Sequence, residues 1–175
     1  MKYLLNIIML FAIFSCDKPT EKKYKLISKV PNLEMPNNHL KFNEIEDYKN
    51  YKIIATHFRT DKNELRYILA NDKAFKAYNK GIPFPDGSKI VKIGWTVKKM
   101  KNFNAALEAD DIQRIEYMVK DRKRFVINPG KWGYARFVKK DNKYKAWSKG
   151  TKSCVSCHNL AKDNDYLFTK MQKIQ

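Results

Sequence analysis

The sequence contains little cysteine. Only 3 of its 175 residues are cysteines: Cys16, Cys154 and Cys157. Cys154 and Cys157 share one short motif, and Cys16 ends an N-terminal apolar run, so no pair is left for a structural disulfide. Internal repeats are also absent, and so is any low-complexity tract beyond a bias to lysine. With 43% hydrophobic residues the chain is not disordered by composition, and one domain with its own core is expected.

Acidic residues are scarce as well. The sequence has 18 Asp and Glu against 36 Lys and Arg, which gives a formal net charge of +18. Such a charge raises nucleic acid as a partner, but the lysines are scattered and no nucleic-acid motif accompanies them. We therefore predict no nucleic-acid partner. A generally basic surface could instead attract an acidic redox partner protein or an anionic membrane surface.

The chain has no apolar run long enough to span a bilayer. The longest, Leu4 to Phe14, is interrupted at Asn6 and has the shape of a signal peptide. The residues Ile13-Phe14-Ser15-Cys16 resemble a bacterial lipobox. We predict that residues 1–15 are a lipoprotein-type signal peptide and that Cys16 is lipidated, which would anchor the protein to a membrane. The alternatives are an ordinary signal peptide or an uncleaved anchor.

Export places the protein in the periplasm or cell envelope. Residues 16–50 are predicted to be a tether and lead-in, with a short helix or simple lead-in at 42–50, and residues 51–175 the folded domain. Alternating apolar residues and turn signals predict the elements of this domain. The strands are expected at 51–57, 64–70, 89–97, 112–119 and 132–139, the helices at 73–79 and 151–161, and a loop at 98–110. The fold class is α+β, a mainly antiparallel β-sheet with a few flanking helices.

The motif Cys154-Val155-Ser156-Cys157-His158 lies on the C-terminal helix. Two thiols three residues apart can each add to a haem vinyl group, and the adjacent His158 can bind the iron. A zinc site would need two more ligands, and His39 and His57 offer no paired spacing. A thioredoxin-like pair would open a helix of a βαβ unit, which is not expected here. We predict one haem c, held by Cys154, Cys157 and His158.

The position of this motif near the C-terminus predicts an open coordination site. Met171 is the one methionine that follows it, while Met100 and Met118 precede it and are expected on strands or in the core. An iron with five ligands and one open face would bind small ligands or substrates.

Three charged residues fall on strand faces that otherwise carry apolar residues. Side chains alternate between faces, so Lys92 shares its face with Ile90, Arg66 with Ile68, and Glu116 with Met118. For any one of them, an exposed sheet face is the simpler interpretation. In a haem pocket, however, a desolvated lysine becomes a nucleophile, and a glutamate can move protons.

Several segments together resemble the cytochrome P-460 family over residues 51–169. The segments are Glu64-Leu65-Arg66, Phe84-Pro85-Asp86-Gly87 with Lys92, Val119-Lys120-Asp121, Asn128-Pro129-Gly130-Lys131-Trp132, and Cys154 to His158 followed by Asp163 to Thr169. The resemblance implies a third covalent haem link from Lys92, a distal proton-transfer role for Glu116, and Arg66 near the haem. It also implies an antiparallel sheet with helices and a possible homodimer.

The activity implied by the resemblance is oxidation of hydroxylamine, with nitric oxide also handled. Two alternatives stay open. Related cytochromes c′-beta share the fold, lack the lysine link and bind NO or CO. The second alternative is a simple electron carrier. It is disfavoured because no suitable methionine follows the motif as a second iron ligand. His57 is expected in the core or on the surface rather than in the distal pocket.

Overall fold

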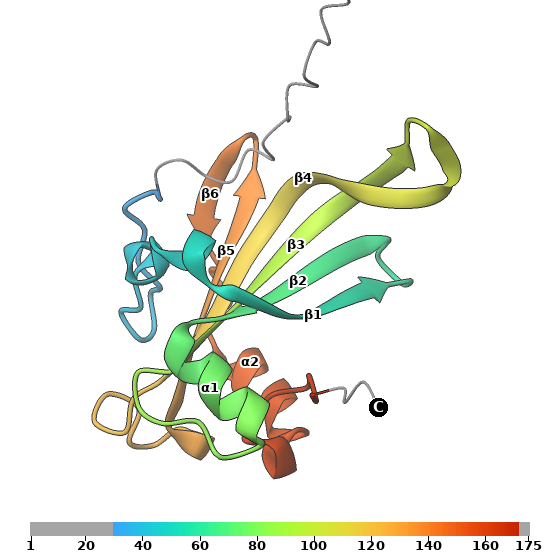
Figure 1. The fold of residues 1–175 in the computed structure, drawn as a ribbon. Helices are drawn as coiled ribbons and strands as arrows, with labels where there is room; N and C mark the ends of the chain where they lie inside the picture. The colour runs from blue at the N-terminus through green and yellow to red at the C-terminus, as the bar shows by residue number, and fades with distance from the viewer. Residues whose placement is uncertain (1–29, 172–175) are drawn as a thin grey trace, which may run out of the picture.

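The structure is a computed structural model that describes residues 30–171. The predicted signal peptide and Cys16 lie outside the described residues. The described chain forms a six-stranded antiparallel sheet in which every strand lies beside its sequence neighbours (Figure 1). The strands are β1 (Lys52–Arg59), β2 (Glu64–Ala70), β3 (Lys89–Met100), β4 (Phe103–Lys120), β5 (Trp132–Lys140) and β6 (Lys143–Ala146). This confirms the predicted α+β class.

The main difference from the sequence prediction lies at residues 98–110. They are not a loop: β3 and β4 continue as one long hairpin, with Lys98 opposite Glu108 and Lys99 opposite Leu107. This hairpin extends beyond the other strands (Figure 1). Most of its side chains are exposed, so the alternation of buried and polar residues that signals a strand is missing there. The short strand β6 was also missed: its four residues alternate between exposed and half-buried positions, but so short a run is a weak strand signal.

Two α-helices flank the sheet, as expected. Helix α1 (Asp72–Lys80) begins where the Asn71 side chain accepts a hydrogen bond from the Ala74 amide, and it ends at Gly81 in the left-handed conformation. Helix α2 (Lys152–Asn159) carries the cysteine motif. No helix in the described part of the chain is long and apolar enough to cross a membrane.

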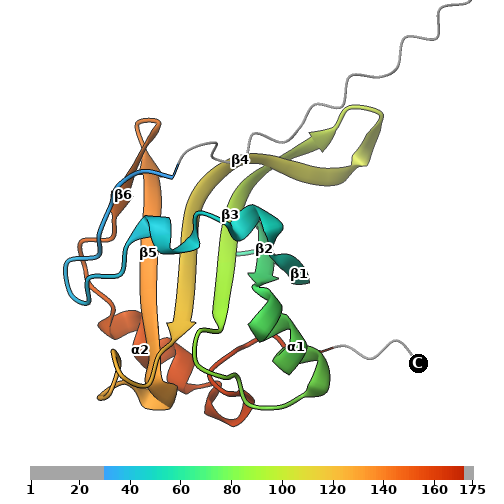
Figure 2. The ribbon, with the colours of Figure 1, turned by 60° about the vertical axis from the view of Figure 1, so that its left-hand side comes forward.

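One face of the sheet is covered by the N-terminal segment. Residues 30–50 cross it with two short 3₁₀-helices, Phe42–Ile45 and Tyr48–Asn50 (Figure 2). The Phe42 ring stacks on Phe137 of β5 with 4.4 Å between centroids, and both side chains are fully buried. This segment therefore belongs to the main hydrophobic core.

The opposite face of the sheet has an apolar part and a charged part, which follow one another along the strands. Toward one end it is apolar, and Ile68, Ile90 and Met118 pack there with α1 and the C-terminal Leu167. Farther along the same strands the same face carries charged side chains. Helix α2 and the C-terminal segment lie over this face (Figures 1 and 2), and the functional site lies between them and the sheet.

Candidate functional site

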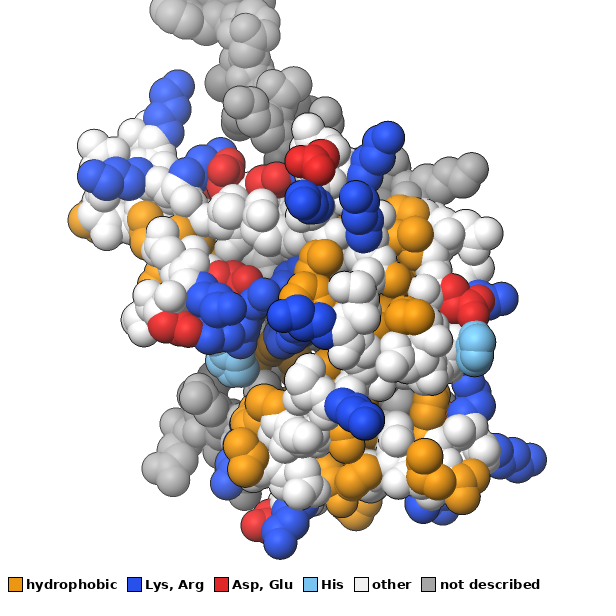
Figure 3. All heavy atoms as spheres, turned by 180° about the vertical axis from the view of Figure 1, so that it is seen from behind, with side chains coloured by type: hydrophobic (Ala, Val, Ile, Leu, Met, Phe, Trp, Pro, Cys, Tyr) orange, Lys and Arg blue, Asp and Glu red, His pale blue; other side chains and the backbone are white. Residues whose placement is uncertain are grey.

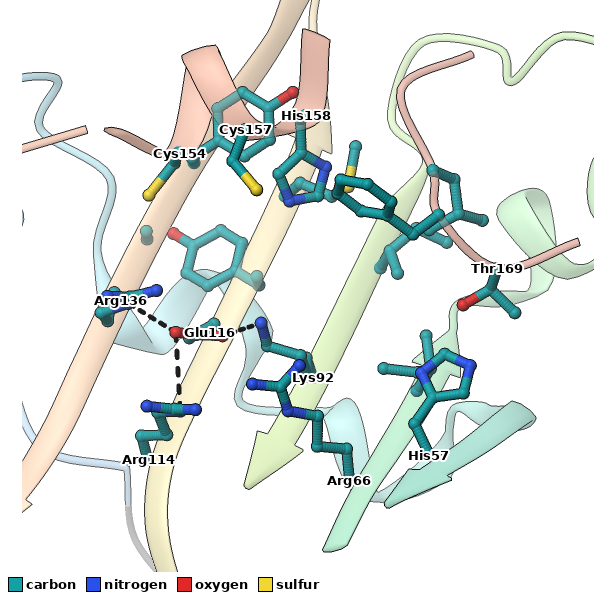
Figure 4. Close-up of a pocket in the computed structure, with 18 of the residues that line it drawn as sticks. His57, Arg66, Lys92, Arg114, Glu116, Arg136, Cys154, Cys157, His158 and Thr169 are labelled. Carbon is teal, nitrogen blue, oxygen red and sulfur yellow. Dashed lines mark ion pairs between the residues drawn. The ribbon is translucent and has the colours of Figure 1, made fainter. Parts of the chain in front are cut away.

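A cavity of about 400 Å³ lies between the sheet and α2. This volume falls within the usual range for ligand and cofactor sites. It is lined on one side by Cys154, Cys157 and His158 and on the other by Lys92 and Glu116, with Arg66 also in its wall (Figure 4). The sheet and the C-terminal helix thus bring together all six domain residues that the sequence predicted for the site.

Helix α2 supplies the thiols and the imidazole. Both cysteines are free thiols, and burial raises the pKa of Cys154. The Nδ1 atom of His158 lies 2.7 Å from the carbonyl oxygen of Tyr166. Because a carbonyl only accepts hydrogen bonds, Nδ1 must carry the proton, and the lone pair on Nε2 is available to a metal. Burial also lowers the pKa of His158, which favours the neutral ring.

The wall on the sheet side is built around Glu116. Lys92 on β3 and Glu116 on β4 are direct cross-strand partners, and their side chains form an ion pair. Arg136 on β5 is the cross-strand partner of Glu116. Its Nε atom lies 2.5 Å from Oε1 of Glu116, and the Nε atom of Arg114 lies 3.7 Å from the same oxygen (Figure 4). Glu116 is only 7% exposed, so these cations compensate the cost of burying its charge.

These contacts determine the protonation of Glu116 and Lys92. Burial by itself would raise the pKa of Glu116, but the attraction of Lys92, Arg136 and Arg114 outweighs it and lowers that pKa below its ordinary value. For Lys92 the balance differs: burial is the larger effect and lowers the pKa of its amine, against the attraction of Glu116. The site therefore holds an ionised carboxylate beside a lysine that loses its proton more readily than usual.

A second buried carboxylate extends this network. Glu64 on β2 accepts hydrogen bonds from Arg66 Nε at 2.5 Å and Arg114 at 2.7 Å, so Arg114 lies between Glu64 and Glu116. Room for this contact comes from Gly94, where a Cβ atom would lie only 3.0 Å from a Glu64 oxygen. Basic side chains also gather beside a histidine on the face shown in Figure 3.

His57 lies at the rim of this site. His57 belongs to β1 and lies opposite Arg66 of β2. It lines the cavity and is exposed to solvent. Burial, together with the charges of Arg66 and Lys92, lowers its pKa. His39 lies on the surface beside Glu34. Within residues 30–171 no three His, Cys, Asp or Glu side chains gather as a metal-binding group, so this part of the chain offers no zinc ligand set.

Sequence reasoning missed Glu64, Arg114 and Arg136. Two of them left a usable signal, because Glu64 lies two residues before Arg66 and Arg114 two residues before Glu116, on the same strand faces. Arg136 left none. Its contact with Glu116 depends on the register of β4 against β5, which residue patterns do not reveal.

The family model for Cytochrome P460 matches residues 45–169. The chain belongs to the cytochrome P460 family. No curated protein gives a match. The predicted family is thereby confirmed, and membership indicates that this P460 chain is a haem c protein.

The residues of the cavity fit that cofactor. Cys154 and Cys157 can supply two thioether bonds, and His158 has its coordinating nitrogen available because Nδ1 is occupied by the Tyr166 carbonyl. The rings of Tyr134 and Phe168 lie 4.8 and 5.3 Å from the His158 ring and limit its rotation. Across the cavity from His158, the charged wall presents the Glu116 carboxylate with its cationic partners (Figure 4).

Proposed function

We propose that this cytochrome P460 oxidises hydroxylamine and passes the electrons to a redox partner protein. The observation that carries the proposal is the position of Glu116, a buried carboxylate held by Arg136 and Arg114 across the cavity from His158. Haem c, when bound, supplies an iron that coordinates the substrate and accepts its electrons.

Oxidation of hydroxylamine requires a group that accepts protons. Two hydroxylamine molecules give one nitrous oxide, one water, four protons and four electrons. The cationic neighbours of Glu116 lower its pKa, so it is ionised near neutral pH and can accept a proton from the bound substrate. Arg136 and Arg114 keep the carboxylate oriented toward the cavity.

Lys92 is the residue that would form the third covalent link to the haem. It lies in the cavity wall on the same strand face as Ile90, and burial lowers the pKa of its amine, which favours the nucleophilic form. Intact mass and the Soret band of the holoprotein test this role. If the link forms, the wild-type mass should fall below the sum of its chain and an ordinary haem c by the hydrogens that the new C–N bond replaces, whereas Lys92→Leu should match its own sum and shift the Soret band. A wild-type spectrum of ordinary haem c, unchanged in Lys92→Leu, would contradict the link.

A steady-state assay with hydroxylamine and an electron acceptor tests the activity. We expect turnover by the wild type and a loss of about 10²-fold or more in Glu116→Gln with the haem retained. Asp111→Asn, a change on the exposed part of β4, is the control and should keep full turnover. Absence of wild-type turnover, combined with tight NO binding, would instead identify an NO-binding protein of the cytochrome c′-beta type.

The predicted location and partners form part of the same proposal. An exported lipoprotein anchored through Cys16 would release its electrons to a redox partner, and the net charge of +18 favours an acidic one. Labelling with a radioactive fatty acid tests the anchor, with Cys16→Ser as the control. Sedimentation of the mature protein tests whether it forms a homodimer.

A further inference from the structure

We propose that Asp165 is a positioning residue for the iron-binding histidine. It holds a turn whose Tyr166 carbonyl accepts the hydrogen bond from His158 Nδ1. The inference requires bound haem but does not depend on hydroxylamine being the substrate.

Asp165 is held by donors from three distant parts of the chain. The ammonium of Lys120 lies 2.7 and 2.6 Å from its two carboxylate oxygens. The Phe84 amide donates to Oδ2 at 2.7 Å, and the Trp132 indole donates to Oδ1 at 3.2 Å. Lys120 is only 6% exposed and Trp132 fully buried. Charge-assisted hydrogen bonds in so buried a place are strong, so the carboxylate is fixed.

The turn at Asp165 needs this support. Asp165 and Tyr166 both have left-handed backbone angles, with φ of 45° and 66°. Each such residue costs roughly 1 kcal/mol or more and persists only where its surroundings hold it. The Tyr166 ring also packs on Gly130, where a Cβ atom would lie 2.3 Å from the ring. Together these contacts fix the direction of the Tyr166 carbonyl.

The carbonyl in turn determines the basicity of His158. A hydrogen bond from the second ring nitrogen fixes the tautomer and orientation of a metal-bound histidine and makes it a stronger electron donor. A stronger donor stabilises the oxidised iron. Asp165 therefore acts on the iron through three steps: the carboxylate holds the turn, the turn aims the carbonyl, and the carbonyl polarises the imidazole.

Three segments that precede the cysteine motif in the sequence converge on Asp165. Phe84 precedes the Pro85-Asp86-Gly87 turn, Lys120 ends β4, and Trp132 follows the Pro129-Gly130 turn. All three donate to Asp165 in the C-terminal segment. Through Asp165, these three donors hold the turn whose Tyr166 carbonyl contacts His158.

The test uses the holoprotein with Asp165→Asn and, independently, Lys120→Met. Each removes the charge from one side of the ion pair. We expect the iron–histidine stretching band of the reduced protein, measured by resonance Raman spectroscopy, to move to lower frequency. We also expect the reduction potential to rise, with a change of about tenfold in the equilibrium between oxidised and reduced iron. Lys120→Arg, which keeps the charge, should restore most of both values.

Asp111→Asn is the matched control. It also breaks a Lys–Asp pair, with Lys139 at 2.8 Å, but on the sheet surface. It should leave the Raman band and the potential unchanged. The proposal is overturned if Asp165→Asn and Lys120→Met, folded by circular dichroism and with haem attached, also match the wild type in both measurements. Neither measurement uses hydroxylamine, so this outcome is distinct from a failure of the proposed activity.

Discussion

The two faces of the central strands differ sharply in chemistry, although they are made by alternate residues of the same segments. On β3, Val91 and Ile93 enter the main core while Lys92 enters the cavity. On β4, Ile115 and Tyr117 flank Glu116 in the same way. One face is closed by the buried apolar side chains of segment 30–50 and stabilises the domain. The other is charged and open enough to hold a cofactor.

This contrast shows how a domain without structural disulfides in its described part can support a charged site. Burial of Glu64 and Glu116 is costly, and on this face they are compensated by Arg66, Arg114 and Arg136 rather than by apolar packing. The other face of the same strands supplies the apolar packing of the main core. Changes on the two faces should therefore have different consequences.

The largest effect is expected where the site face meets α2. In the double variant Cys154→Ala, Cys157→Ala, made in a Lys92→Leu background so that the proposed lysine link is also absent, we expect complete loss of covalently bound haem, because both thioether bonds are removed. Haem staining after denaturing electrophoresis measures this. Ser156→Ala lies between the two cysteines on an exposed position and should keep the stain. Haem that stays attached in the double variant would contradict thioether attachment.

On the core face, Phe137→Ala should destabilise the protein without direct loss of the site. The fully buried ring stacks on Phe42, and its removal leaves a cavity that costs about 3–5 kcal/mol of unfolding free energy. Urea unfolding measures the loss. Phe103→Ala removes a ring that is 61% exposed on β4 and should change stability by about 0.5 kcal/mol or less. An equal loss of unfolding free energy in the two variants would contradict the assignment of the main core to this face.

A smaller change, Gly94→Ala, should affect the site face alone. The added methyl group would lie 3.0 Å from a Glu64 oxygen and 3.1 Å from Arg114 Cγ, so it must displace the bridge between the two carboxylates. We expect a loss of about 1–3 kcal/mol in urea unfolding. A crystal structure should show Arg114 moved while Phe42 and Phe137 stay stacked. Stability equal to that of the wild type would indicate that the bridge contributes little.

The smallest expected effect is a difference in pH dependence. The folded-state pKa of Glu116 is lowered by Lys92 and Arg136 against the effect of burial. Its stabilising contribution is therefore present above the ordinary glutamate pKa of about 4.3 and is lost as the pH falls through the folded value. In urea unfolding from about pH 6 to about pH 3, the wild type should lose more stability than Glu116→Gln. Parallel curves would show that Glu116 gains nothing from its cationic neighbours.

The local patterns of the sequence predicted most of the sheet. Alternation in β2, β3 and β5 located the strands because one face of each is buried, and the Asn71 and Gly81 signals bounded α1. The patterns failed on the 98–110 hairpin, where exposure on both faces removes the alternation, and on β6, whose four alternating residues are too short a run to be recognised. It also gave no sign that Met35 and Leu40, in the predicted tether and lead-in, are fully buried.

Residue patterns were enough to predict the cofactor chemistry, since thiol spacing and an adjacent histidine are local properties of one helical turn. They also assigned Lys92, Arg66 and Glu116 to strand faces. That these faces line one cavity depends on the fold of the whole domain. Strand register brings Lys92, Glu116 and Arg136 into one row, and Lys120, 45 residues before Asp165, holds the turn whose carbonyl contacts His158. Such contacts join residues far apart in the chain, and their energies depend on burial that no local pattern records.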